Sequence, residues 1–249
     1  MANPFFVLNV PSTNAVGTLD PADVTLYGDA EVGAWGHWLF GPDADSYYGL
    51  NGRQLTEQDA APAFSTNYVS LPVANGDALL TGLNPITAGL TSWTFCGVLQ
   101  RPAALAATVS LFGNIVGSQG SGLYLASGVR MAANYGGSNQ TANSSMLLPD
   151  DEPVFVGVSM DWSTSINNLN FVLGGVGQSN HSKGTGSLAH RDAAFAVGNR
   201  DSASADANLV RFHEAMMFTS ALTPAQMNAI NTRSVTRMAN RGVVIDGPV

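Results

Sequence analysis

The chain has 249 residues, of which 45% are hydrophobic and 11% are charged, with a formal net charge of −8. This length fits one large domain, because all-β sandwiches commonly reach roughly 200 to 250 residues as a single unit. An acidic chain whose only lysine is Lys183 lacks the positive surface that nucleic-acid binding requires. Its apolar runs also fall short of the roughly 18 residues that a membrane-spanning helix needs. We therefore expect no nucleic-acid partner and no membrane insertion.

Cys96 is the only cysteine, so no intrachain disulfide can form, and its place in an apolar strand predicts a small core residue. The N-terminal sequence has no positively charged start, and its apolar run of about five residues is shorter than the roughly 7 to 15 of a signal peptide. This pattern favours synthesis in the cytoplasm without secretion. A secreted protein whose signal had been removed would look the same.

Residues 1–33 differ from the rest of the chain and are expected to form an arm. The stretch PFFVLNV at 4–10 is a strand candidate, and a polar segment follows it. An isolated apolar strand has to pair with a sheet edge, either in its own domain or in a neighbouring subunit.

Apolar and polar residues alternate in several later segments, which is typical of strands with one buried face. In 153–162 the apolar positions share one side, while Ser159 and Asp161 point to the other. One apolar face per strand predicts a two-sheet sandwich. Ser127 and Gly128 are expected to form a tight turn between two strands, and 177–187 is expected to be a flexible loop because it is rich in glycine and serine.

One helix is predicted near the end of the chain. Thr223 suits the N-cap, Pro224 the first helical position, and Gln226 completes a capping box. Met227 and Ile230 would face the core, and Gly242 would end the helix.

Several segments, taken in order, resemble the laminin G-like and concanavalin A-like lectin and glucanase jelly rolls. They are HWLFGPDADSYYGLNGR (37–53), NYVSLP (67–72), SWTFCGVLQ (92–100), SLFGN (110–114), GLYLASGVRMAANYG (122–136), PVFVGVSMDW (153–162), AFAVGNRDS (194–202), LVRFHEAMMF (209–218) and SALTPAQMNAI (220–230). The resemblance implies an all-β, two-sheet antiparallel jelly-roll sandwich with one short C-terminal helix. It divides the chain into an arm (1–33), the jelly roll (34–232), and the helix end with a tail (233–249).

Glucanases of this family carry two or three acids in a Glu-x-Asp-x-x-Glu or Glu-x-Asp-x-Glu run on one strand, and this chain has no such run. We therefore expect no enzyme activity. The alternative is a glycan-active hydrolase that uses Glu214, Asp161 or Glu152 from separate segments. The family more often places a structural acid at the position of Glu214, which we expect to bond an arginine.

The resemblance also suggests calcium, because such domains often hold this cation in oxygen-rich loops. The candidate ligands are Asp43, Asp45, Asn199 and Asp201. Aspartates in turns also bond their own backbone, and the sequence leaves both roles open. No cofactor is otherwise expected.

Sugar binding needs an aromatic ring beside amide or carboxylate groups. Two loops have this composition, and they offer Tyr47, Tyr48, Asn51, Tyr135, Asn139 and Gln140. Core-edge tyrosines and turn asparagines would give the same pattern.

Together these features predict a non-enzymatic, lectin-like protein of a virion surface, either a capsid decoration protein or a tail-associated adhesin of a phage. It would be made in the host cytoplasm, released by lysis, and joined to other virion proteins through residues 1–33. We also expect a homo-oligomer and host or environmental glycans as partners. A stand-alone carbohydrate-binding module is the third hypothesis.

Overall fold

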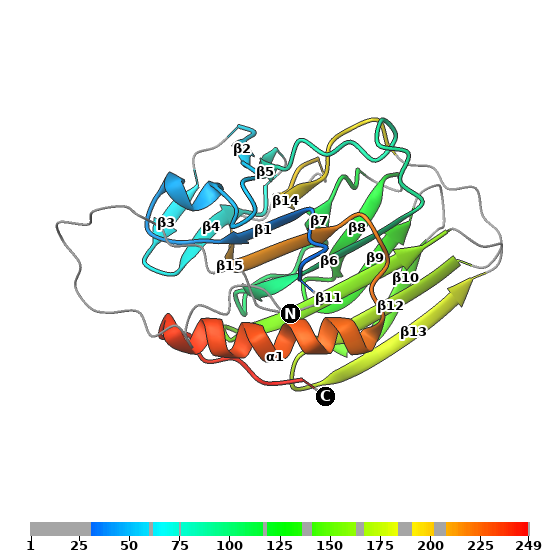
Figure 1. Cartoon of the computed structure of the whole chain (residues 1–249). Coiled ribbons are helices and arrows are strands. Elements are labelled where there is room, and N and C mark those ends of the chain that lie inside the picture. The colour runs from blue at the N-terminus through cyan, green and yellow to red at the C-terminus, as the bar shows by residue number, and fades with distance from the viewer. Residues whose placement is uncertain are drawn as a thin grey trace, which may run out of the picture.

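A computed structural model describes residues 31–59, 62–74, 76–116, 119–135, 141–162, 167–183, 191–201 and 208–248. Within these ranges the strands form two antiparallel sheets, and one α-helix lies against the larger sheet (Figure 1). The predicted all-β, two-sheet sandwich with a C-terminal helix is confirmed. Residues 1–30 of the predicted arm lie outside the described residues.

The eight-stranded sheet is centred on three long, apolar strands. Its order is β13 (Gly177–Lys183), β12 (Asn167–Leu173), β11 (Pro153–Asp161), β6 (Ser92–Gln100), β15 (Leu209–Phe218), β4 (Tyr68–Pro72) and β3 (Ala63–Ser65), with β1 (Gly36–Leu39) also paired to β15. β15 is long enough to pair with β4 along its first half and with β1 along its second half.

The seven-stranded sheet packs against one face of this larger sheet. Its order is β10 (Thr141–Leu147), β9 (Arg130–Tyr135), β8 (Ser121–Ala126), β7 (Val109–Gly113), β14 (Ala196–Asn199), β5 (Asp77–Leu80) and β2 (Thr56–Glu57). A 3-10 turn, η2 (Ala44–Tyr47), lies between β1 and β2. Between the sheets, the Phe112 ring stacks on Phe95 with ring centroids 5.7 Å apart and meets Phe212 edge-on. Such aromatic pairs add about 0.5–1.5 kcal/mol each to the burial of their area.

A second core lies on the opposite face of the eight-stranded sheet, under helix α1 (Pro224–Asn240). Met227, Ile230 and Met238 of the helix pack against Cys96, Phe155 and their neighbours in the sheet. Central strands β6, β11 and β15 are therefore buried on both faces. The expectation of one apolar face per strand was wrong for these strands, because the helix covers much of the face that would otherwise meet water.

The ends of α1 follow the predicted chemistry. Thr223 accepts a hydrogen bond from the Gln226 backbone, and the Gln226 side chain accepts one from the Thr223 backbone. Gly242 follows the helix with φ of +74°, a conformation that favours glycine. The predicted turn is also confirmed, since Ser127 and Gly128 both have positive φ between β8 and β9.

An irregularity in β15 changes which residues face the core. The register of β15 against β6 shifts between Phe212 and Glu214. Phe212 therefore faces the core between the sheets, while Glu214 and Met216 face α1. Strict alternation along β15 would place Phe212, Glu214 and Met216 on one side, and the bulge is the physical reason that they face two different sides.

One segment also differs from expectation. Residues 177–183 form edge strand β13, paired to β12 along its length and cross-linked by an Asn180–Asn170 side-chain hydrogen bond, rather than a flexible loop. α1 runs without a break from Pro224 to Asn240 and packs on the sandwich along this length.

We expect Gly97→Ala to destabilise the protein by about 1–3 kcal/mol, because an added Cβ would lie 2.1 Å from the backbone oxygen of Glu214 at the β6–β15 contact. Thermal or urea unfolding measures the change. Gly177→Ala is the matched control, since a Cβ there meets no atom within 4 Å. Equal stability of the two variants would show that β6 and β15 are not packed this closely.

Candidate functional site

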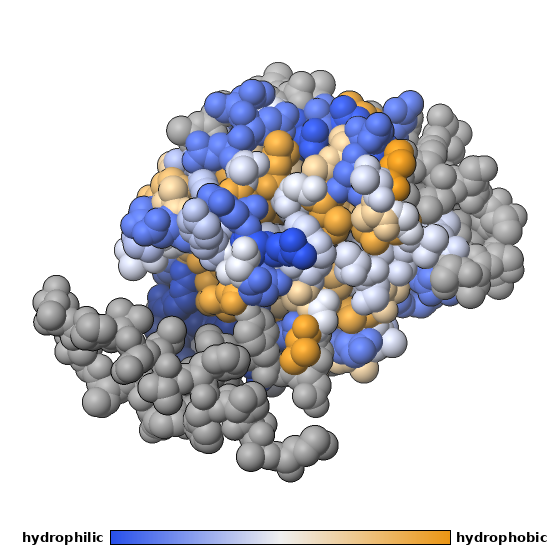
Figure 2. All heavy atoms as spheres, turned by 45° about the horizontal axis from the view of Figure 1, so that its top comes forward, coloured by the Kyte–Doolittle hydropathy of each residue, from blue (hydrophilic) through white to orange (hydrophobic). Residues whose placement is uncertain are grey.

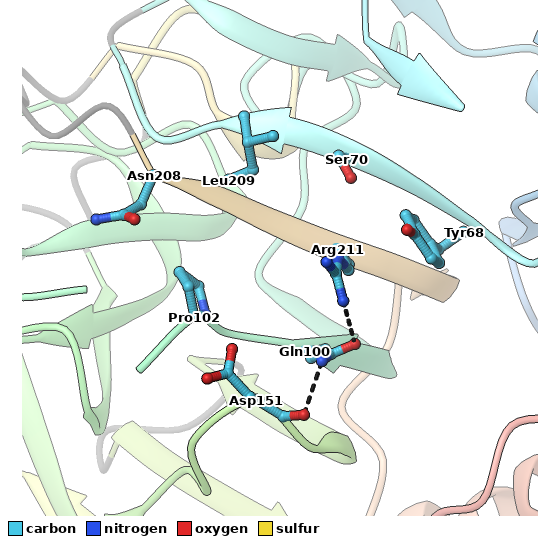
Figure 3. A pocket seen from close by; sticks show the side chains of 8 residues that line it. All are labelled: Tyr68, Ser70, Gln100, Pro102, Asp151, Asn208, Leu209 and Arg211. Atoms are coloured by element: carbon cyan, nitrogen blue, oxygen red, sulfur yellow. Dashed lines mark hydrogen bonds between the residues drawn. The ribbon is translucent and has the colours of Figure 1, made fainter. Parts of the chain in front are cut away.

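α1 leaves part of the outer face of the eight-stranded sheet uncovered, and an open groove lies there. Its cavity volume is about 410 Å³, and it crosses strands β4, β15 and β6. The residues that line it are Tyr68, Ser70, Gln100, Pro102, Asp151, Asn208, Leu209 and Arg211 (Figure 3). We refer to these residues as the β15 groove.

The strand register places three polar side chains of the groove in one row. Arg211 pairs with Ser70 on β4 and with Gln100 on β6, so the three side chains stand beside one another across three strands. Arg211 lies between buried Val210 and Phe212, and alternation along β15 therefore turns its side chain outward.

Hydrogen bonds and one ring contact organise this row. Arg211 Nη1 donates to Gln100 Oε1 at 3.3 Å, and Gln100 Nε2 donates to the backbone oxygen of Asp151 at 2.7 Å (Figure 3). The guanidinium carbon of Arg211 lies 5.0 Å from the centre of the Tyr68 ring, within cation–π range. The groove thus presents an aromatic ring, a cation, an amide, a hydroxyl and the carboxylate of Asp151.

His213 lies behind this row, edge-on to the Tyr68 ring at 5.4 Å. Burial lowers the pKa of His213 to about 4, and the charges of Arg241 and Arg211 lower it further against the opposing effect of a backbone hydrogen bond to Asn67. The imidazole is therefore neutral at pH 7. Arg211 is the one cationic side chain among the residues that line the groove.

A smaller hollow lies on the seven-stranded sheet, with a cavity volume of about 290 Å³. Its lining is uncharged and consists of Thr108, Ser110, Ile115, Tyr124, Ala126, Asn134, Thr141 and Asn143. We refer to these residues as the β8 hollow. It offers one aromatic ring and several hydroxyl and amide groups, which makes it the main rival to the groove.

The sugar-binding residues predicted from the sequence have different surroundings within the described part of the structure. Tyr47 is 5% exposed and its hydroxyl donates to Glu57, so it belongs to the core edge. Asn51 donates to the backbone oxygens of Ala34 and Trp35 and so braces a loop. Tyr48 projects, with 59% of its surface exposed, and Asn51 is also exposed. Tyr135 ends β9, its side chain is not described, and Asn139 and Gln140 lie outside the described residues.

Three of the four predicted calcium ligands, Asp43, Asn199 and Asp201, have side chains bonded to protein partners. Asp43 caps η2 by accepting from the Asp45 backbone. Asn199 is buried and donates to the backbone oxygen of Val73 at 2.5 Å. Asp201 pairs with Arg191 and Arg200, which neutralise its carboxylate. Among the described residues, no group of three or more His, Cys, Asp or Glu side chains is arranged to hold a metal ion.

A buried ionic network joins β15, β1 and α1. Glu214 is fully buried and accepts from Arg237 Nε at 2.7 Å, Ser234 Oγ at 2.5 Å and His37 Nε2 at 2.8 Å. Arg237 Nη1 also donates to Glu31 at 2.6 Å. The predicted bond from Glu214 to an arginine is confirmed, and Arg233 and Arg237 bind Glu31 to the helix.

Of the three acids that were candidates for hydrolysis, two lie far apart and the third is buried. Glu152 and Asp161 flank opposite ends of β11, roughly 30 Å apart at about 3.3 Å per residue. A glycosidase pair needs a separation of about 5 to 10 Å. Glu214 has no exposed surface and lies beneath α1.

The groove residues were missed in the sequence because none belongs to a recognisable motif. The available signal was the placing of Arg211 and Tyr68 beside buried positions of their strands, which predicts outward side chains. That signal cannot reveal which part of the outer face the helix leaves open.

Comparison with known proteins shows the fold. No protein-family model matches the chain, and no curated protein matches it. The botulinum neurotoxin serotype D binding domain superposes with a TM-score of 0.57 at 11% identity, over 81% of this chain and 52% of the toxin chain. A second structure is that of botulinum neurotoxin type C, whose cell entry is described as dependent on interaction with two ganglioside molecules. It superposes with a TM-score of 0.53 at 11% identity, over 78% of this chain and 50% of the toxin chain.

Trypanosoma rangeli sialidase in complex with sialic acid gives a TM-score of 0.56 at 10% identity, over 84% of this chain and 33% of the sialidase. This chain therefore spans about half of the toxin chains and a third of the sialidase. The likeness shows a lectin-like β-sandwich fold. Among the described residues, no helix is long and apolar enough to cross a membrane.

The network predicts how stability depends on pH. Burial alone would raise the pKa of Glu214, but Arg237, His37 and Ser234 outweigh it and lower the pKa from 4.5 to about 2. A lowered pKa stabilises the folded state above pH 4.5, and this stabilisation is lost as the pH falls from 4.5 toward 2. We expect Glu214→Gln to lower stability at pH 7 by about 3–5 kcal/mol, because Arg237 loses a buried partner.

The same variant should show a shallower loss of stability between pH 4.5 and 2, measured by melting temperature across this range. Glu152→Gln, at an exposed carboxylate, is the control and should change neither property. An unchanged acid slope in Glu214→Gln would show that this carboxylate is not held ionised by the network.

Proposed function

We propose that this protein is a non-enzymatic, lectin-like binding protein whose β15 groove holds a glycan. The observation that carries the proposal is the row of Ser70, Arg211 and Gln100 beside the Tyr68 ring, on the part of the sheet that α1 leaves open.

The chemistry of the lining suits a sugar. An aromatic ring packs against the apolar face of a pyranose, while amide, hydroxyl and carboxylate groups exchange hydrogen bonds with its hydroxyls. Tyr68 is half-buried and supplies the ring. Gln100, Asp151 and Ser70 supply the polar groups.

The fold neighbours support this choice of ligand class. The botulinum neurotoxin type C structure is described by an interaction with gangliosides, and the sialidase structure contains sialic acid. Both ligands are glycans or carry them.

Binding without hydrolysis is proposed because the candidate acids are far apart. Asp151 is the one carboxylate that lines the groove, and the two-carboxylate mechanism of most glycosidases requires a second acid across the bond.

We further propose that the protein acts on a virion surface, as a capsid decoration protein or a tail-associated adhesin, and forms a homo-oligomer. The single, buried Cys96 suits synthesis in a reducing cytoplasm. The apolar stretch at 4–10 suits docking on a sheet edge of another virion protein.

Tyr68→Ala should reduce glycan binding by about tenfold or more on an array or by calorimetry, because the sugar loses its ring contact. Tyr48→Ala is the matched control, since Tyr48 is an exposed tyrosine in the loop predicted from the sequence. Loss of binding in Tyr48→Ala with full binding in Tyr68→Ala would move the site to that loop.

Deletion of residues 1–30 should abolish incorporation into particles while the sandwich stays folded. The deletion keeps Glu31, whose carboxylate accepts from Arg233 and Arg237. Density-gradient sedimentation with mass spectrometry measures incorporation, and melting temperature checks folding. A truncated protein that still sediments with particles, or a full-length protein that never does, would contradict the virion role.

A further inference from the structure

We propose that the glycan held by the β15 groove is acidic, and that Arg211 binds a carboxylate on one of its sugars. This inference rests on the proposed function, since it names the class of ligand for the same site. Two observations support this inference: the position of the Arg211 guanidinium in the groove, and the number of its N–H donors that make no hydrogen bond to the described residues.

Arg211 differs from most arginines of the chain in its partners. Five described arginines pair with carboxylates of this protein, namely Arg101, Arg191, Arg200, Arg233 and Arg237. Among the described residues, Arg211 forms no such ion pair, and its one hydrogen bond is the 3.3 Å contact with Gln100. A guanidinium has five N–H donors in a planar fork that matches a carboxylate, so most of this capacity remains for a ligand.

The position of Arg211 places its N–H donors in the groove. It stands in the centre of the row, with Ser70 on one side and Gln100 on the other, and the Tyr68 ring lies against it (Figure 3). A carboxylate on a sugar packed near Tyr68 would meet the guanidinium and have the Ser70 hydroxyl as a neighbour.

Asp151 restricts the ligand further. Its carboxylate lies on the other side of Gln100, in the turn before β11 (Figure 3). A carboxylate accepts hydrogen bonds from hydroxyl or amide N–H groups and repels anions. The groove therefore suits a ligand with one acidic group and several hydroxyl or N–H donors, which is the chemistry of an acidic sugar.

The charge of the whole protein argues against a polyanion. With a formal net charge of −8, long-range electrostatics repel nucleic acid and heavily sulfated chains. His213 adds no positive charge at neutral pH, because its pKa is about 4. On the face shown in Figure 2, hydrophobic residues lie in several patches among hydrophilic residues.

The test uses the full chain and a glycan array in which each acidic glycan has a neutral counterpart, followed by calorimetry. Two such pairs are 3′-sialyllactose with lactose, and a glucuronic acid-terminated oligosaccharide with its carboxyl-reduced form. We expect the acidic member to bind about tenfold or more tightly. The preference should weaken as salt is raised from 50 mM to 500 mM, because the groove is open to solvent.

Three variants locate the source of the preference. Arg211→Gln should abolish the difference between acidic and neutral members, and Arg211→Lys should keep part of it because it keeps the charge without the fork. Arg130→Gln is the matched control, since it removes an exposed arginine from β9 on the other sheet and should leave the preference unchanged. Melting temperatures confirm that each variant is folded.

The outcomes separate the acidic-glycan inference from the proposed function. Equal binding of both members, a neutral preference, or an acidic preference that survives in Arg211→Gln would overturn the acidic-glycan inference while glycan binding stands. Failure to bind any glycan on the array would overturn both.

Discussion

Burial of the eight-stranded sheet on both faces is the constraint on which the rest of the structure depends. One face packs on the seven-stranded sheet through Phe95, Phe112 and Phe212. The other packs on α1 through Met227, Ile230 and Met238. Where α1 covers strands β6, β11 and β15, they are mostly apolar on both sides because both sides exclude water. The helix is therefore part of the sandwich, and its length decides how much of the outer face stays open.

The bulge in β15 then divides the strand into two chemically different parts. Beyond the bulge, Glu214 lies under α1, where Arg237, Ser234 and His37 satisfy its carboxylate. Before it, Arg211 projects outward between β4 and β6 with a single weak hydrogen bond. The charge of Glu214 is thus paired inside the protein, whereas the charge of Arg211 is exposed to solvent in the groove. The proposed glycan site follows from this division.

The sequence predicted those features that depend on local chemistry. The capping box at Thr223 and Gln226, the positive-φ turn at Ser127 and Gly128, and the strand at 92–100 all appear as expected. The features that failed depend on contacts distant in the chain. Alternation in β15 could not reveal a bulge, because the bulge is defined against β6. The glycine- and serine-rich β13 forms a strand because β12 supplies its hydrogen-bonding partners.

The candidate site was unpredictable for a related reason. The sequence signal for sugar binding was a loop composition, and it selected Tyr47 and Asn51, which the fold uses for its own hydrogen bonds. The groove instead combines residues from β4, β6, β15 and the turn before β11, and its existence depends on where α1 stops covering the sheet. No local pattern contains that information.

Hydrogen–deuterium exchange with and without a bound acidic oligosaccharide would show which of the two sheets holds the ligand. We expect added protection at the β15 groove, in residues 68–72, 100–102, 151–153 and 208–212. Protection confined to the β8 hollow, in residues 108–115, 124–126 and 141–143, would contradict it and place binding on the seven-stranded sheet.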